Sequence, residues 1–501
     1  MFAPYEITRG GRTWHGDVAV KEHRLFVRDG AHCLFLVPDM AAVPVSADVA
    51  AAIARLTPGF STLVPDELMR ALRGCGLVGE AQKEAAGPEE EAGGDAGADP
   101  AAEHGDRDGA APCFPVTSLA LFLTQTCNLR CVYCYGEGGE YGERGVMDER
   151  TALAAVDRLF EGCGGSASVR VNFFGGEPLL GFPLLRRVVA HARGRAASCG
   201  KQVAFGMTTN ATVLTDEMIA CIVEERIDLL VSCDGPPAIH DLQRPFRNGR
   251  GSYARVLANV QRLRAALPGL TAKATVCAGG DPFAVRRGLE DAGFTSCLLT
   301  AASPVVLRET GAADPRGAER AADQWRQTAE RMLAYRRAEV TRLFGAVRER
   351  RLEAGPALGE VTLLAALARG RKRHTGCGAG RGMRAVAVNG DVYPCHRFVG
   401  LGETRLGHLS DGGLAGLTDF HRAVVENLAG CRRCWARHFC GGGCFYDNLA
   451  RSGDMRRPDP LFCDETKTVC EDVIHGWLRL SDDDRAYVRE QAAQPDDTPR
   501  P

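Results

Sequence analysis

Six short apolar runs, separated by amphipathic segments, constrain the fold of this chain more than any other feature. The runs lie at 119–123, 169–174, 203–207, 228–232, 272–276 and 297–300. Apolar runs of this length are typical of strands buried on both faces, as in parallel sheets. The repeated strand–helix units therefore predict an α/β fold with a parallel, barrel-like sheet.

Candidate functional segments follow the first four of these runs. In a barrel of strand–helix units, the chemistry collects at the carboxyl ends of the strands. The segments lie at 126–134, 175–178, 209–210 and 232–236, and the fifth run carries Lys273 and Thr275. Their shared position predicts one site at one end of the barrel.

The first segment holds Cys127, Cys131 and Cys134 at the spacing C-x3-C-x2-C. Three thiolates bind three irons of a cubane cluster and leave the fourth iron open, whereas four close the site as in ferredoxins. Structural zinc is the alternative, but zinc sites usually have four ligands, and no fourth lies nearby in the sequence. The loop therefore favours a catalytic iron–sulfur cluster.

With Tyr133 directly before the last cysteine, this spacing resembles the radical S-adenosylmethionine (SAM) superfamily. The resemblance implies a partial (βα)6 radical SAM barrel. In it, a [4Fe–4S] cluster splits SAM, and a deoxyadenosyl radical abstracts a hydrogen atom from the substrate. The cofactor-binding residues it implies are Tyr133, Gly175, Gly176, Glu177, Asn210, Ser232 and Arg244.

Their roles follow from the same resemblance. The Gly-Gly-Glu segment resembles the motif that binds the amino group of SAM, because a carboxylate suits an ammonium and glycines admit a ligand close to the backbone. Asn210, Ser232 and Arg244 resemble residues that hold its carboxylate or ribose. For Arg244, the alternative is a solvated surface arginine. The surrounding pattern Asp234-Gly235-Pro236…His240-Asp241, typical of sulfatase- and peptide-maturating members, favours the functional role.

A second cysteine set lies in the C-terminal region, in the pattern C-x12-G-x4-C, then C-x2-C-x5-C-x3-C, then a last cysteine. Two of these cysteines alone would suit a zinc knuckle. The complete series closely resembles the SPASM domain, which carries two auxiliary [4Fe–4S] clusters, so three clusters are expected in all. The resemblance implies an outer cluster on Cys431, Cys434, Cys440 and Cys463 and an inner cluster on Cys377, Cys395 and Cys444.

A fourth ligand for the inner cluster is not apparent. The neighbours of Cys377 offer no thiol, so the inner cluster is expected to have an open iron or an unidentified ligand. Cys470 is a spare candidate, and a buried helix cysteine is its alternative interpretation.

The N-terminal region has a different pattern. Strand-like runs at 23–27 and 32–36 flank an Asp29-Gly30 turn, which predicts a hairpin, and helices are expected at 46–56 and 66–72. This suggests a winged-helix-like module that resembles the leader-binding domain of ribosomal-peptide maturases. In such a domain an exposed strand pairs with an extended leader peptide. The alternatives are an accessory domain or a DNA-binding winged helix, but the stretch lacks a clustered basic helix.

The expected organisation has six parts: a leader-binding module (1–82), an acidic disordered linker (83–112), the barrel (113–330), a helical connection (331–368), the SPASM domain (369–475) and a tail (476–501). The linker lacks large apolar residues and cannot form a core. A net charge of −2 gives no reason to expect nucleic acid as a partner. The chain has neither a membrane-length apolar run nor a signal-peptide pattern, so a cytoplasmic location without membrane contact is expected.

The resemblance favours a peptide maturase that installs a thioether or carbon–carbon crosslink in a precursor peptide with a leader, using a small redox protein as electron donor. A sulfatase-type maturase that forms formylglycine is the second hypothesis. Those relatives have an Asp after the cysteine where this chain has His396, which weakens it. The third is a non-catalytic iron–sulfur redox protein, which predicts a damaged SAM site. His396 is also the candidate base that accepts the proton released by bond formation, with a structural hydrogen bond as the alternative.

Overall fold

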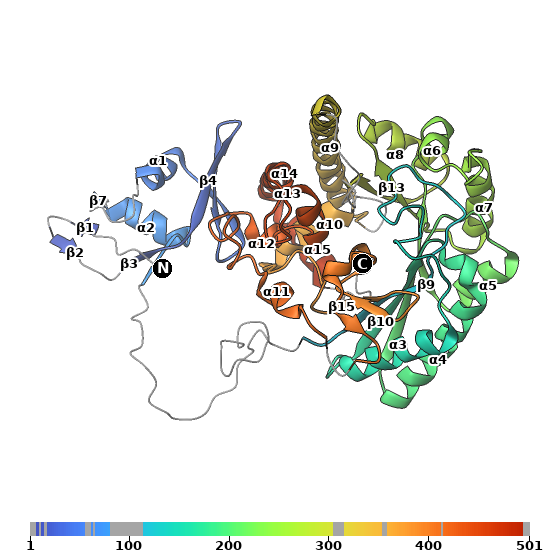
Figure 1. Cartoon of the computed structure of the whole chain (residues 1–501). Helices are drawn as coiled ribbons and strands as arrows, with labels where there is room; N and C mark the ends of the chain where they lie inside the picture. Colours follow the sequence, from blue (N-terminus) through green and yellow to red (C-terminus); the bar gives the residue numbers. More distant parts are fainter. Residues whose placement is uncertain are drawn as a thin grey trace, which may run out of the picture.

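The computed structural model describes residues 7–9, 12–14, 18–55, 62–63, 66–80, 114–303, 315–352, 358–411 and 414–493. The expected acidic linker and the last eight residues of the expected tail lie outside this range. Figure 1 shows a small N-terminal unit (blue), a C-terminal region (orange to red) beside it, and a strand–helix barrel (green) on the far side.

The barrel is built on six parallel strands that follow one another in space in the order of the sequence. They are β9 (Ser118–Thr124), β10 (Ser168–Gly175), β11 (Gln202–Thr209), β12 (Ile227–Ser232), β13 (Thr271–Val276) and β14 (Ser296–Ala301). Each includes one of the six apolar runs, so the predicted α/β fold with a parallel sheet is confirmed. The sheet stays open, because β14 ends it on one side while β15 (Met383–Val386) pairs with β9 on the other.

Helices cover the outer face of this sheet (Figure 1). Their apolar faces form one core with the strands, in which Phe173, Phe205 and Val231 are fully buried. Local signals fix their starts: Asp148 caps α3 by accepting from Thr151 N at 2.9 Å. The helices are α3 (Glu149–Gly162), α4 (Phe182–Cys199), α5 (Asp216–Glu224), α6 (Pro237–Gln243), α7 (Tyr253–Ala266) and α8 (Pro282–Asp291).

The C-terminal region continues the sheet through β15 and two antiparallel strands, β16 (Asp391–Tyr393) and β17 (Gly407–His408). Two helices precede it, α9 (Pro315–Arg348) and α10 (Leu358–Arg369), and α9 crosses the boundary expected at residue 330. The remaining helices are α11 (Leu417–Arg422), α12 (Arg437–Cys440), α13 (Phe445–Ser452), α14 (Pro460–Leu478) and α15 (Asp482–Ala493).

Helix α15 lies in the range expected to be a tail. The prediction of a tail is therefore partly wrong. Its Val488 is only 2% exposed and belongs to the core that α9, α10 and α14 share. Three aspartates in its first turn complement the positive end of the helix dipole. Among the helices that the structure describes, none combines the length and apolar character needed to cross a membrane.

The N-terminal unit contains the expected hairpin, formed by β4 (His23–Arg28) and β5 (Ala31–Leu36) around Asp29 at φ 52°. The third strand of this sheet is β6 (Ala41–Val45), and α1 (Ala47–Arg55) and α2 (Asp66–Gly74) match the two expected helices. Short strands complete the unit: β1 (Ile7–Arg9), β2 (Arg12–Trp14), β3 (Val18–Val20), β7 (Thr62–Leu63) and β8 (Val78–Glu80). Its winged-helix identification stays a prediction.

The hairpin sheet packs directly on the C-terminal region. The rings of Phe26 and Trp435 meet edge to face at 5.0 Å, and Phe35 stacks on Phe439 at 5.5 Å. Arg28 pairs with Asp472 at 2.5 Å. Because the two regions bury apolar side chains in one core, the N-terminal unit is anchored by packing as well as by the chain.

Candidate radical SAM site and auxiliary cysteine sets

The loop with Cys127, Cys131 and Cys134 lies at the carboxyl end of β9, as expected. The three thiols are close enough to perturb one another electrostatically. The backbone holds the loop in place, since Arg130 N donates to Pro245 O at 2.8 Å and Val132 N to Gln243 O at 2.9 Å. Burial first, and then Glu177, raise the pKa of Cys127 to about 12, so a metal that takes its thiolate must displace a proton.

The glycine segment after β10 lies backbone-to-backbone against this loop. Gly176 N donates to Thr124 O at 2.8 Å, and Glu177 N donates to Thr126 O at 3.0 Å. A Cβ atom on Gly176 would lie 2.1 Å from Thr126 O, which no side chain tolerates. Glycine is therefore required here by the approach of the cysteine loop itself.

The carboxylate of Glu177 is buried and joins the ends of two strands. It accepts hydrogen bonds from Thr209 Oγ1 at 2.7 Å, Asn210 N at 2.7 Å and Leu179 N at 3.1 Å. Burial raises its pKa, and these donors oppose the rise. Among the described residues, Oε2 accepts only the Asn210 bond, and it can accept another. The role of Glu177 toward an ammonium group stays a prediction, but its role in fixing the site is visible.

Asn210 contacts the cysteine loop from β11. Its Nδ2 lies 3.7 Å from Cys127 Sγ and donates to Asn128 Oδ1 at 2.9 Å. Its Oδ1 accepts from Thr212 N at 3.0 Å and Thr212 Oγ1 at 2.6 Å. The side chain is thus occupied in orienting the loop and one thiol.

Arg244 is 7% exposed, so its interpretation as a solvated surface arginine is wrong. Its guanidinium donates to Tyr133 Oη and lies 3.9 Å from Asp234 Oδ1, while Tyr133 Oη donates to Asp234 Oδ2 at 2.7 Å. Arg244 also acts electrostatically on Cys131. Its Nε is buried and has no hydrogen-bond partner among the described residues. This arginine therefore keeps a free donor beside the cysteine loop.

Sequence reasoning gave no role to three residues that support this network. The buried Asp234 also accepts from Thr275 N at 3.0 Å, which ties β12 to β13. His240 joins Asp234 N to Ser252 Oγ, and Ser252 Oγ donates to Arg244 O at 2.6 Å. Asp234 and His240 belong to the sequence pattern around Arg244. That pattern was the signal from which their roles could have been predicted. Ser232 ends β12 opposite Lys273 on β13.

The C-terminal cysteines fall into the two expected groups. Burial first, and then Cys377 and Cys444, raise the pKa of the buried Cys395. Burial first, and then Cys440, Cys463 and Cys434, raise the pKa of Cys431 to about 12. The second group lines a cavity of about 390 Å³, which Arg24 of the N-terminal unit also lines. The structure thus brings each set together, although ligation stays a prediction. Cys470 is buried in α14 near Cys440 and Cys434 of the outer set, and the fourth ligand of the inner set stays unidentified.

Arg397 connects the inner set to the barrel. Its guanidinium donates to Cys444 Sγ at 3.4 Å and to Asp447 Oδ2 at 2.7 Å. It lies 4.2 Å from the ring centroid of Tyr446 and 5.5 Å from that of Tyr135, which follows Cys134 in the chain. A short path therefore runs from the first cysteine loop to the inner set.

His396 is partly buried and lies against Phe174 of β10, with ring centroids 4.5 Å apart. Burial first, and then Lys273 and Arg397, lower its pKa to about 3, which keeps the imidazole neutral. Burial and Arg397 also lower the pKa of Lys273. Lys273, His396 and Arg397, each partly buried, thus form a basic group between β13 and the inner cysteine set. A role for His396 as base stays a prediction.

Comparison with known proteins gives the class. Residues 121–282 match the family model of the Radical SAM superfamily. An uncharacterized protein of Methanocaldococcus jannaschii is 33% identical over 146 residues, which cover 29% of this chain and 48% of that protein. The serine-type anaerobic sulfatase-maturating enzyme of Klebsiella aerogenes is 29% identical over 140 residues, covering 27% of this chain and 34% of that enzyme. The matches span less than half of either relative.

Among solved structures, anSMEcpe with bound AdoMet superposes with a TM-score of 0.59 at 17% identity, covering 75% of this chain and 99% of that one. The fold is thus an α/β partial barrel of the kind seen in that enzyme. Within it, residues 121–282 form a radical SAM domain.

A radical SAM domain implies SAM and a [4Fe–4S] cluster, and the residues present fit both. Three thiols share one loop, which suits a cubane with one open iron. The free Nε of buried Arg244 is a donor for a carboxylate, and the glycine segment brings bare backbone to the cysteine loop.

Proposed function

We propose that the chain is a radical SAM enzyme that oxidatively modifies a ribosomally made peptide, installing a thioether or carbon–carbon crosslink. The observation that carries the proposal is the path from Tyr135, beside the first cysteine set, through Arg397 to Cys444 of the inner set. Forming a crosslink removes electrons from the substrate, and auxiliary clusters at the end of such a path are suited to accept them.

The chain's own residues prepare the site. Cys127, Cys131 and Cys134 would hold the cluster. Together with SAM, the bound cluster would supply one-electron hydrogen abstraction. Glu177 fixes the strand ends, and Arg244 offers a cationic donor to the SAM carboxylate. The partly buried basic group around Lys273 would attract anionic groups of a substrate. The inner and outer sets would hold two further [4Fe–4S] clusters.

The N-terminal unit would recruit the leader of the precursor. Strand β4 is an edge of its sheet, and its Val27 side chain is 59% exposed. Its six residues all carry an N–H, whereas the other edge, β6, contains Pro44, which has none. An extended leader would therefore add to β4 by backbone pairing. A small redox protein is the proposed electron donor.

A sulfatase-type maturase is the second candidate, favoured by the similarity to the Klebsiella enzyme. Both reactions oxidise a side chain, but only formylglycine is an aldehyde. The reconstituted enzyme should be incubated with SAM, dithionite and either a leader-bearing Cys-rich peptide or a sulfatase-motif peptide. We expect loss of hydrogen from the first peptide without reaction toward a hydrazide. An aldehyde formed only in the second peptide would support the alternative and contradict the crosslinking proposal.

A further inference from the structure

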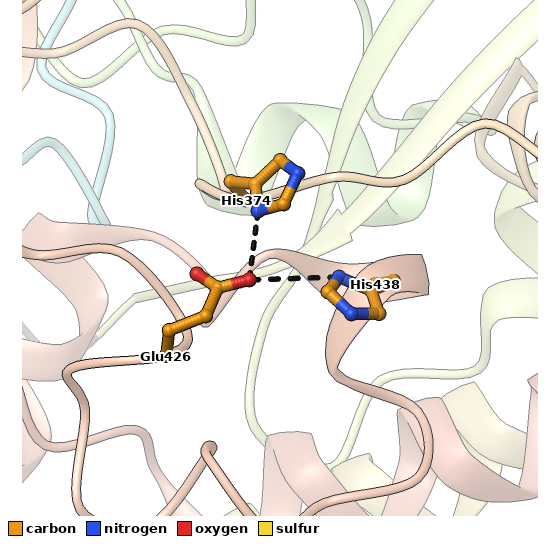
Figure 2. A group of neighbouring side chains, drawn as sticks. All are labelled: His374, Glu426 and His438. Atoms are coloured by element: carbon orange, nitrogen blue, oxygen red, sulfur yellow. Dashed lines mark hydrogen bonds and ion pairs between the residues drawn. The ribbon is translucent and has the colours of Figure 1, made fainter. Parts of the chain in front are cut away.

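Two histidines and a glutamate, which the proposed function does not use, meet beside the outer cysteine set. His374 precedes Cys377, Glu426 precedes Cys431, and His438 lies in α12 between Cys434 and Cys440. Figure 2 shows both imidazole rings turned toward the same carboxylate oxygen. His374 Nδ1 lies 2.7 Å from Glu426 Oε1, and His438 Nδ1 lies 4.0 Å from it.

The buried member of the group points to a missing ligand. His438 is 5% exposed, and its Nδ1 has no hydrogen-bond partner in the described part of the chain. A buried ring nitrogen without a partner costs free energy unless something binds it. The carboxylate oxygen at 4.0 Å is beyond hydrogen-bond distance, so it does not satisfy this nitrogen.

Backbone hydrogen bonds hold the three segments together independently of the side chains. Val425 N donates to His374 O at 2.9 Å, and Arg373 N donates to His438 O at 3.0 Å. The three ligand atoms all lie within 4.8 Å of one another. Around a tetrahedral zinc ion, neighbouring ligand atoms are about 3.3 Å apart, so small side-chain movements would complete the geometry.

The ligand types select the metal. Two imidazole nitrogens and one carboxylate oxygen suit zinc or a similar first-row ion, whereas calcium and magnesium prefer oxygen alone. The Glu426 side chain is 43% exposed, so water has access to a fourth position. The nearby Arg437 is already paired with Glu22 at 2.5 Å, which reduces its repulsion of a cation.

We propose that His374, Glu426 and His438 form a zinc site that fastens the segment before Cys377 to the loop and helix of the outer cysteine set. The ion would stabilise the arrangement of both auxiliary sets without taking part in catalysis. The site uses no cysteine, so it can be filled independently of the clusters.

The test uses the full chain with its clusters reconstituted, washed with a mild chelator and titrated with zinc chloride. We expect one zinc per chain, and X-ray absorption at the zinc edge should show only nitrogen and oxygen neighbours at about 2.0 Å. Glu426→Gln and His374→Ala change partly exposed side chains, so both variants should fold. Each should weaken zinc binding at least about tenfold while iron content stays unchanged.

His191→Ala is the matched control, because His191 Nε2 pairs with Asp157 Oδ1 at 2.9 Å, and no second histidine in the described part of the chain completes a metal-binding group there. This variant should bind zinc like the unchanged chain. The proposal is overturned if zinc does not bind or if sulfur neighbours appear at about 2.3 Å. It is also overturned if Glu426→Gln and His374→Ala both bind zinc as tightly as the control. None of these results bears on peptide modification, so failure here is distinct from failure of the proposed function.

Discussion

The barrel site and the C-terminal cysteine sets assemble in different ways. The barrel site takes its three thiols from one loop, Cys127 to Cys134, and supports them with Glu177 and the Tyr133–Asp234–Arg244 network. The outer set gathers its cysteines from segments between 431 and 463, and its cavity is lined partly by Arg24 of the N-terminal unit. The first site therefore has all its thiols on one loop, which residues from other strands of the same barrel support, whereas residues of two separate regions line the cavity of the second.

The largest effect is expected from Cys131→Ala. Three thiolates are the minimum that holds the open cubane, so this variant should lose reductive SAM cleavage completely. Because the C-terminal sets assemble separately, their iron should remain bound. Deoxyadenosine formation under dithionite and iron analysis measure both results. Cleavage at the unchanged rate would contradict the assignment, and loss of all iron would contradict the independence of the two regions.

His396→Ala tests the interior between the two regions. If the imidazole accepts the proton released by bond formation, product should fall about 100-fold while deoxyadenosine formation and iron content persist. Peptide mass spectrometry measures the product. Product formed at the unchanged rate would exclude His396 as the base, and loss of iron would instead indicate ligation or structural support. His408→Ala, in β17, serves as the control.

Arg244→Ala should weaken the barrel site without disturbing the C-terminal sets. Removing the guanidinium leaves the fully buried Asp234 without its cation, which costs about 3–5 kcal/mol of folding stability. SAM binding should also weaken, because the free Nε donor is lost. Thermal unfolding and SAM titration measure these changes. Arg158→Ala, in an exposed pair with Glu161, is the control and should be near neutral. Unchanged SAM affinity in Arg244→Ala would remove it from the cofactor site.

The smallest expected effect concerns the N-terminal unit. Val27→Asp places a charge on the exposed face of edge strand β4, away from the packed contact of Phe26. Leader binding should weaken about tenfold, while SAM cleavage stays unchanged. Fluorescence anisotropy of a labelled leader peptide measures binding. Equal leader affinity in the variant and the unchanged chain would contradict recruitment through β4.

The sequence predicted the structural features that local residue patterns determine. The six barrel strands and the Asp29-Gly30 hairpin were predicted because apolar runs and turn residues determine them directly. The β15–β16 hairpin was missed although Asn389-Gly390, a strong turn signal, lies between its strands, because those strands have only four and three residues.

Contacts between distant segments could not be predicted from local sequence patterns. The stacking of Phe35 on Phe439 joins regions that an acidic stretch separates in the sequence. The burial of Arg244 and the meeting of His374 with His438 also depend on tertiary packing. Cysteine spacing was the exception, since the motif predicted two C-terminal sets whose members lie near one another in the fold, while their ligation stays a prediction.

One chain is proposed to hold a SAM-type cluster and two auxiliary clusters in separately assembled sites. Iron and acid-labile sulfide should be measured after anaerobic reconstitution of the unchanged chain and of the variant with Cys127, Cys131 and Cys134 all changed to alanine. We predict about twelve irons in the unchanged chain and about eight in the variant, since each cluster holds four. A plateau near four irons in the unchanged chain, or zinc bound through sulfur in place of iron, would contradict the presence of three clusters.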